Sequence, residues 1–173
     1  MAEKRIAVET TTISYSGILD VNNLYNYIDN YTNERGWDKM DFMHDIKNHE
    51  TTRDILIDMR PEKTISDYVK FKLKIVAKFS NITDIEVTVD GKKVNVQKGS
   101  VKISYTGIII TDYEGDWKST AWWQFMKTLY DKYVFKLHES EYDANLKSEI
   151  FNMKHEISAY LNLKKYIDSR PRI

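Results

Sequence analysis

Residues 68–79, YVKFKLKIVAKF, decide the fold class, because apolar and basic side chains alternate along the whole stretch. Successive side chains of a β-strand point to opposite faces of a sheet. The stretch therefore predicts a long strand with one apolar face and one wet face, which is typical of an antiparallel sheet covered on one side only. The apolar side chains are Val69, Phe71, Leu73, Ile75, Ala77 and Phe79, and the wet ones are Lys70, Lys72, Lys74 and Lys78.

Other strand patterns lie on both sides of this stretch. Residues 4–15 alternate and are rich in Thr, which predicts a first strand that ends at Gly17. Further strands are expected over about 40–112, beginning with a hairpin that turns at residues 48–50. Asp90-Gly91 lies between two alternating runs and is a strong hairpin signal, and Lys98-Gly99 predicts another turn. The sequence thus predicts an antiparallel sheet of about six to seven strands.

Helical spacing takes over in two regions. Asp20 is a suitable N-cap for a helix over 20–35, and Gly36 supplies the left-handed residue that ends it. Apolar residues at three- and four-residue steps predict two C-terminal helices, at about 119–136 and 139–165. An amphipathic helix that follows a sheet is expected to cover its apolar face. We therefore expect an α+β fold with both C-terminal helices packed on one face.

Composition limits the class of protein. The 173 residues fit one domain, 1–173, and 26 basic side chains balance 26 acidic ones. A neutral chain is not typical of a non-specific nucleic-acid binder, although a local basic patch would still allow nucleic acid as a partner. The chain has no Cys, and neither a signal-peptide pattern nor an apolar run long enough to span a membrane. We expect a cytoplasmic protein.

An aromatic stripe in the C-terminal region is the candidate ligand-binding site. Its rings can line a cavity between helix and sheet, or they can simply fill the helix–sheet interface. Since a buried indole N–H needs a partner, at least one of Trp122 and Trp123 is expected near a polar group or an edge. The stripe consists of Trp117, Trp122, Trp123, Phe125, Tyr130 and Tyr133.

The lysine-rich wet face is the candidate polyanion-binding site. Its side chains can meet phosphate, RNA or lipid headgroups. They can equally form an ordinary solvated face that discourages edge-to-edge pairing. The candidate residues are Lys70, Lys72, Lys74, Lys78, Lys92 and Lys93.

No pattern identifies a reaction. The acidic run Asp112, Glu114 and Asp116 lacks the spacing of a calcium loop and is better suited to the N-terminus of the following helix. The four histidines match no metal or catalytic motif. The sequence therefore predicts no catalytic residue, no metal site and no cofactor.

The order of elements, a strand, a helix, further strands and C-terminal helices, resembles the helix-grip arrangement of the START and polyketide-cyclase-like superfamily. The resemblance is one of topology over most of the chain, and that superfamily usually has two short helices where we expect one longer helix. It implies a cavity between the curved sheet and the final helix that takes an apolar ligand.

Three functional hypotheses follow. The first is a non-catalytic domain that binds an apolar small molecule or a protein partner through its aromatic-rich C-terminal helical side. The second is a structural or accessory subunit of a larger assembly or homo-oligomer, with RNA or another polyanion on its lysine face. The third is an enzyme of START-like fold.

Overall fold

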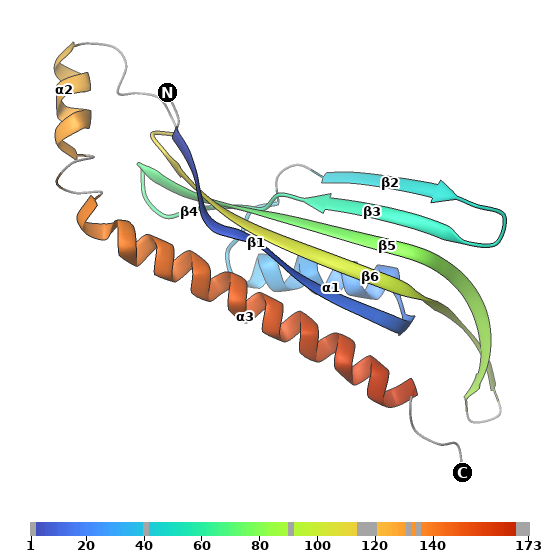
Figure 1. Ribbon diagram of the computed structural model, residues 1–173. Helices are drawn as coiled ribbons and strands as arrows, with labels where there is room; N and C mark the ends of the chain where they lie inside the picture. The colour runs from blue at the N-terminus through green and yellow to red at the C-terminus, as the bar shows by residue number, and fades with distance from the viewer. Residues whose placement is uncertain are drawn as a thin grey trace.

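The computed structural model describes residues 3–39, 42–89, 92–113, 121–130, 133 and 136–168. The fold is α+β with an antiparallel sheet, as the alternation in residues 68–79 predicts (Figure 1). The elements are β1 (Glu3–Leu19), α1 (Val21–Glu34), β2 (Phe42–Asn48), β3 (Arg53–Met59), β4 (Glu62–Thr64), β5 (Val69–Val89), β6 (Lys92–Thr111), α2 (Ala121–Tyr130) and α3 (Lys136–Asp168).

The described residues form one six-stranded sheet in the order β1-β6-β5-β3-β2, with β4 paired to the beginning of β5. Its centre is a hairpin of two long strands, β5 with 21 residues and β6 with 20. The predicted turn at Asp90-Gly91 lies outside the described residues. The hairpin predicted to turn at residues 48–50 is confirmed by the regular pairing of β2 with β3, but its loop covers residues 49–52, because Asn48 pairs with Arg53.

Two predicted strand ends are wrong, because Gly17 and Gly99 lie inside β1 and β6 and face each other across the sheet. Lys98-Gly99 is therefore not a turn. A Cβ atom on Gly99 would lie 3.0 Å from the carbonyl oxygen of Ser80. At this level the pairing of β5 with β6 shifts register, between Ser80 and Thr83. Glycine allows this close approach of the two backbones, so it continues the strand where the sequence suggested a break.

Helix α1 begins and ends as predicted. The carboxylate of Asp20 accepts a hydrogen bond of 2.9 Å from the backbone N–H of Asn23, which satisfies one of the free donors of the first turn. Gly36 has a φ of 73° just after the helix. The buried side chains of α1, among them Leu24 and Ile28, lie in the same core cluster as the apolar face of the sheet.

The prediction of two C-terminal helices packed on one face is wrong for α2. Of these two helices, only α3 lies along the sheet, next to β1, whereas α2 lies beyond the end of the sheet (Figure 1). The core cluster accordingly takes Leu146, Ile150, Met153, Ile157 and Leu161 from α3 and no described side chain from α2. Tyr27 of α1 stacks on Tyr160 of α3 with ring centroids 4.6 Å apart, so both helices share one face of the sheet.

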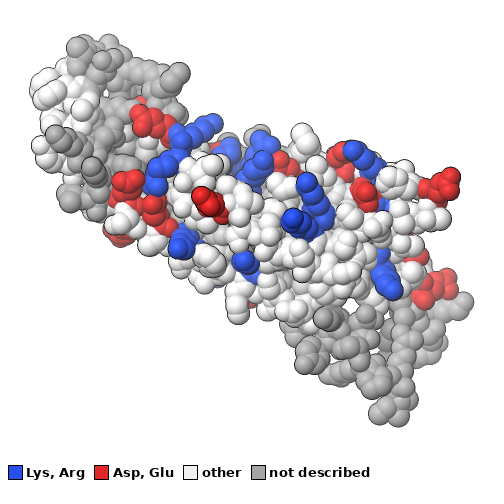
Figure 2. Space-filling model, viewed as in Figure 1, with Lys and Arg blue, Asp and Glu red and all other residues white. Residues whose placement is uncertain are grey.

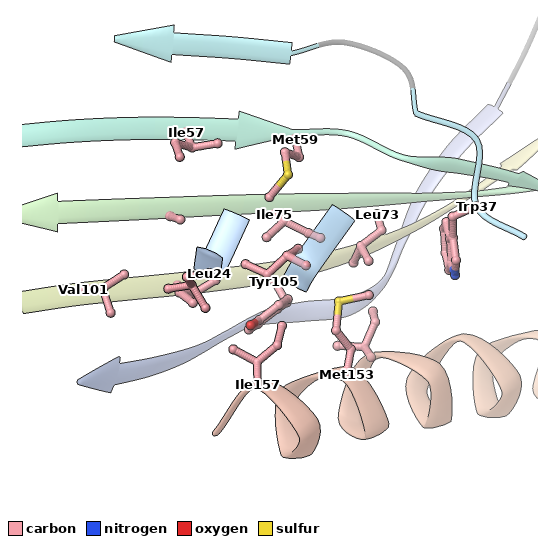
Figure 3. Packing of buried hydrophobic residues seen from close by; sticks show 14 of the residues in the cluster. Leu24, Trp37, Ile57, Met59, Leu73, Ile75, Val101, Tyr105, Met153 and Ile157 are labelled. Carbon is pink, nitrogen blue, oxygen red and sulfur yellow. The ribbon is translucent and has the colours of Figure 1, made fainter. Parts of the chain in front are cut away.

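The interface between α3 and the sheet is filled by side chains. Met153 and Ile157 meet Tyr105 and Leu73 at the centre of the core (Figure 3). At Gly107 the helix comes so close that an added Cβ atom would lie 2.6 Å from Cδ1 of Ile150. Direct packing of this kind leaves no space for a ligand at that position.

Polar contacts hold α3 along its length. Arg5 of β1 donates two hydrogen bonds to Asp143, of 3.1 and 2.5 Å. Further along, Glu149 accepts from the indole N–H of buried Trp37 at 2.9 Å and from Lys63 at 2.7 Å. Because these partners come from separate segments of the chain, they define one position of the helix on the sheet.

None of the helices in the described part of the chain combines the length and the apolar character that crossing a membrane requires.

Candidate functional site

Helix α2 exposes large aromatic side chains. Trp122 is 63% exposed and Phe125 is 55% exposed, with ring centroids 6.1 Å apart. We call these two residues the α2 aromatic surface. Their exposure fits the expectation that Trp122 or Trp123 lies at an edge, and it shows that the rings of Trp122 and Phe125 do not fill the interface between helix and sheet.

The rest of the predicted aromatic stripe is only partly described. Tyr133 follows α2 and is 57% exposed. Trp123 and Tyr130 belong to α2, but their side chains lie outside the described part of the structure, as does the whole of Trp117. The structure therefore brings together Trp122 and Phe125, and it places them away from the apolar face of the sheet.

The predicted lysine row divides into two halves. In the first half, the carboxylate of Glu62 on β4 lies 2.7 Å from Nζ of Lys72 and 3.5 Å from Nζ of Lys70. Burial would raise the pKa of Glu62, but the hydrogen bonds and charges of these two lysines outweigh it and hold the pKa below its ordinary value. Lys70 also lies 4.3 Å above the ring of Tyr113. These two lysines therefore already form contacts within the chain.

In the second half, Lys78 faces another lysine. It lies directly opposite Lys102 of β6, which in turn lies opposite Ser14 of β1. Both lysines are exposed, and neither forms an ion pair with another described residue. Like charges directly opposite each other destabilise a strand pair, so this arrangement favours an anion that neutralises both.

A hollow of about 480 Å³ lies beside the two lysines on the outer face of the sheet. The next row across the three strands holds only short polar side chains, since Ser16 lies opposite Ser100 and Ser100 opposite Ser80. Short side chains leave the space open. The hydroxyl groups of Ser14, Ser16 and Ser80 can donate to an anion, whereas that of Ser100 donates to the backbone carbonyl oxygen of Ser80 at 3.3 Å. We call the hollow with its two lysines and four serines, Ser14, Ser16, Ser80 and Ser100, the Lys78–Lys102 hollow.

Sequence reasoning did not pair Lys102 with Lys78 across the sheet, and it singled out none of these serines. Counting outward from the Asp90-Gly91 turn places Lys78 opposite Ile103. The register shift between Ser80 and Thr83 places it opposite Lys102 instead. The signal was present all the same, because a basic side chain opposite an apolar one conflicts with a sheet that has one wet face and one dry face.

The other predicted candidate residues that the structure describes do not gather at a site. Lys74 lies on the outer face of β5 opposite Thr106, whereas the side chains of Lys92 and Lys93 lie outside the described part of the structure. Asp112, the one described member of the acidic run, is buried. Among the described residues no group of three or more His, Asp or Glu side chains is arranged to hold a metal ion. On the face seen in Figure 2, basic and acidic side chains are interspersed.

Comparisons with known proteins add no relative, since neither a protein-family model nor a curated protein matches the sequence.

Proposed function

We propose that this protein is a non-catalytic binding domain that docks a protein partner through the α2 aromatic surface. The observation that carries the proposal is the exposure of Trp122 and Phe125, 63% and 55%, on a helix beyond the end of the sheet (Figure 1). Apolar area in water carries a free-energy cost that burial against a partner removes. Tryptophan is also enriched among the residues that dominate the binding energy of protein interfaces.

A protein partner is favoured over an apolar small molecule. A small apolar ligand needs a concave site that covers most of its surface. On α3, the side chains that would form the lid of such a site are already packed against the sheet, with Ile150 and Ile157 fully buried. Rings as exposed as Trp122 and Phe125 suit a partner that brings its own complementary surface.

A photo-crosslinking amino acid in place of Phe125 tests the proposal in cells of the native source. We expect one reproducible crosslinked protein, and we expect Trp122→Ala in the same chain to reduce its yield at least about tenfold, the effect of losing about 1.4 kcal/mol at an interface hot spot. The matched control carries the crosslinker in place of Phe151, which is 46% exposed on α3. Equal crosslinking at both positions, or a yield that Trp122→Ala leaves unchanged, would contradict the proposal.

The second candidate function is binding of a phosphate-bearing polyanion at the Lys78–Lys102 hollow. It rests on the two facing lysines beside a row of serine hydroxyls. Phosphate oxygens accept strong hydrogen bonds from lysine ammonium groups, and they release counterions when they do so. This candidate narrows the predicted polyanion site from the whole lysine row to its second half.

Fluorescence anisotropy with a labelled single-stranded RNA tests this candidate. Binding should weaken steeply with salt, and the Lys78→Gln/Lys102→Gln double variant should lower the slope of log affinity against log salt by about 1.4, or about 0.7 for each lost contact. Lys147→Gln, an exposed lysine of α3, should leave the slope unchanged. Affinity that does not depend on salt, or on these two lysines, argues against the hollow.

We also propose that the chain is a distant structural analogue of the helix-grip superfamily. Support comes from the strand order β1-β6-β5-β3-β2 and from the long C-terminal helix along one face of the sheet. The single helix α1 after β1 departs from the usual pair of helices. The ligand cavity and the START-like activity that the resemblance implies are not part of this proposal.

A further inference from the structure

Strand β2 is an open edge of the sheet. It pairs with β3 through seven consecutive residues without a register shift, and no strand in the described part of the chain lies on its other side. All side chains of residues 43–48 are exposed. Two of them are large and apolar, Met43 at 58% and Ile46 at 53%. A regular strand with these properties is a template for a further strand.

The opposite edge of the sheet, β1, is protected. Its pairing with β6 shifts register twice, between Ile6 and Val8 and between Val8 and Thr11. Helix α3 runs alongside it (Figure 1) and is held there by Arg5 and Asp143. Bulges and a covering helix are two devices by which proteins prevent edge pairing. Among the described residues, β2 is therefore the edge that can accept a further strand.

The charges of β2 select its partner. In an antiparallel pair of two β2 strands centred on Ile46, Asp45 of each copy lies opposite Lys47 of the other, and Ile46 lies opposite Ile46. A centre on Asp45 would place two carboxylates opposite each other, and a centre on Lys47 would place two ammonium groups opposite each other, both of which are unfavourable. We propose that β2 is a self-association site, which pairs antiparallel with β2 of a second copy of this chain about a two-fold axis at Ile46.

Both faces of the joined sheet are consistent with this register. Ile46 lies opposite Ile55 of β3 on the apolar face of the sheet, so the two copies of Ile46 would extend that face across the junction. Asp45 and Lys47 lie on the outer face, and within the chain Lys47 is opposite Asp54. The same patch meets itself across a two-fold axis, as in most dimers. The α2 aromatic surface takes no part, so this inference is independent of the proposed function.

Charge reversal and mixing test the register directly. In a dimer of Asp45→Lys, the new lysine of each copy would lie opposite Lys47 of the other copy. In a dimer of Lys47→Glu, the new glutamate of each copy would lie opposite Asp45 of the other copy. The dissociation constant of each single-variant dimer should be at least about tenfold higher than that of the wild type. An equimolar mixture restores two opposite-charge pairs, and native mass spectrometry should show the heterodimer in excess over either homodimer. Sedimentation velocity gives the dissociation constants.

Several results would overturn the proposal. They are a wild-type chain that stays monomeric at its highest soluble concentration, single variants that dimerise as well as the wild type, and a mixture that forms no heterodimer although both variants are folded by circular dichroism.

Because the new carboxylate in Lys47→Glu would face Asp54 in its own chain, a further variant, Ile46→Lys, tests the same axis. It places two ammonium groups on the axis and should be monomeric. Met43→Lys, equally exposed but outside the pairs formed by residues 44–48, should remain dimeric.

Discussion

At the scale of single residues, a tyrosine hydroxyl lies at the centre of the core. Tyr105 is fully buried between the sheet and α3 (Figure 3). Its hydroxyl group has no hydrogen-bond partner among the described residues, and burial raises the pKa of Tyr105 well above its ordinary value. A buried hydroxyl without a partner costs about 1–3 kcal/mol of desolvation.

Tyr105→Phe removes that hydroxyl and keeps the ring. We expect it to raise the free energy of unfolding by about 1 kcal/mol, measured by urea denaturation. Ile103→Val, also fully buried on β6, is a control for core perturbation and should lower the stability by about 0.5–1.5 kcal/mol. A loss of stability in Tyr105→Phe would mean that an internal water hydrogen-bonds to the hydroxyl group.

Glu62 gives the fold a pH-dependent contact with Lys70 and Lys72. Because its pKa is lower in the folded chain than the value of about 4.3 in an unfolded one, the contact stabilises the fold above about pH 4 to 5. That stabilisation is lost as the pH falls through the folded-state pKa. Glu62→Gln should therefore cost about 1 kcal/mol at pH 7, and the difference from the wild type should shrink as the pH falls through the folded-state pKa of Glu62.

The measurement is urea unfolding at a series of pH values. Glu9→Gln, an exposed glutamate of β1, serves as the control and should follow the wild-type curve. A difference between Glu62→Gln and wild type that persists unchanged into acid would show that the contact stabilises the fold through packing and not through charge.

At the scale of elements, two consecutive helices have different roles, and their apolar patterns alone did not separate them. Both α2 and α3 have apolar residues at helical spacing. In α3 these residues meet the sheet, whereas in α2 Trp122 and Phe125 face water. Hydrophobic periodicity predicts that a helix has an apolar face. It does not tell whether that face meets the core of its own chain or a partner.

The contact of α3 with the sheet depends on Gly107. Gly107→Ala should lower the free energy of unfolding by about 1–3 kcal/mol, because the new methyl group would overlap Cδ1 of Ile150. Ile150→Val deletes that Cδ1 atom, so the double variant should be more stable than the sum of the two single effects predicts. Ser104→Ala, on the outer face of the same strand, should change the stability by less than about 0.5 kcal/mol.

Helix α2 should contribute little to the stability of the sheet. We expect Trp122→Ala/Phe125→Ala to change the free energy of unfolding by less than about 0.5 kcal/mol, measured by urea denaturation followed by far-UV circular dichroism. A loss comparable to that of Gly107→Ala would mean that these rings pack against the body of the protein, and it would remove the basis of the proposed function.

At the scale of the whole molecule, the sheet has a dry face under α1 and α3 and an outer face that carries the Lys78–Lys102 hollow. Its two edges differ: bulges and α3 protect β1, whereas β2 has no neighbouring strand on its outer side among the described residues. Association through the open edge has a signature that leaves the core unchanged. Amide hydrogen exchange in β2 should slow as protein concentration rises, while exchange in β1 stays constant, because only β2 gains backbone partners. Equal slowing at both edges would point to another mode of assembly.

The sequence by itself determined the α+β class, the antiparallel sheet, the cap of α1 at Asp20 and the dry and wet faces of β5. Each of these depends on side chains within a few residues of one another, whose alternation or capping chemistry is readable locally. Only the tertiary structure decided that Lys78 faces Lys102, that Glu62 neutralises the other half of the lysine row, and that α3 covers the sheet while α2 does not. Those facts depend on a one-residue register shift and on contacts between distant segments. The register shift lies at the close approach of two backbones at Gly99, and the contact of α3 with the sheet includes the close approach at Gly107. A local pattern encodes neither.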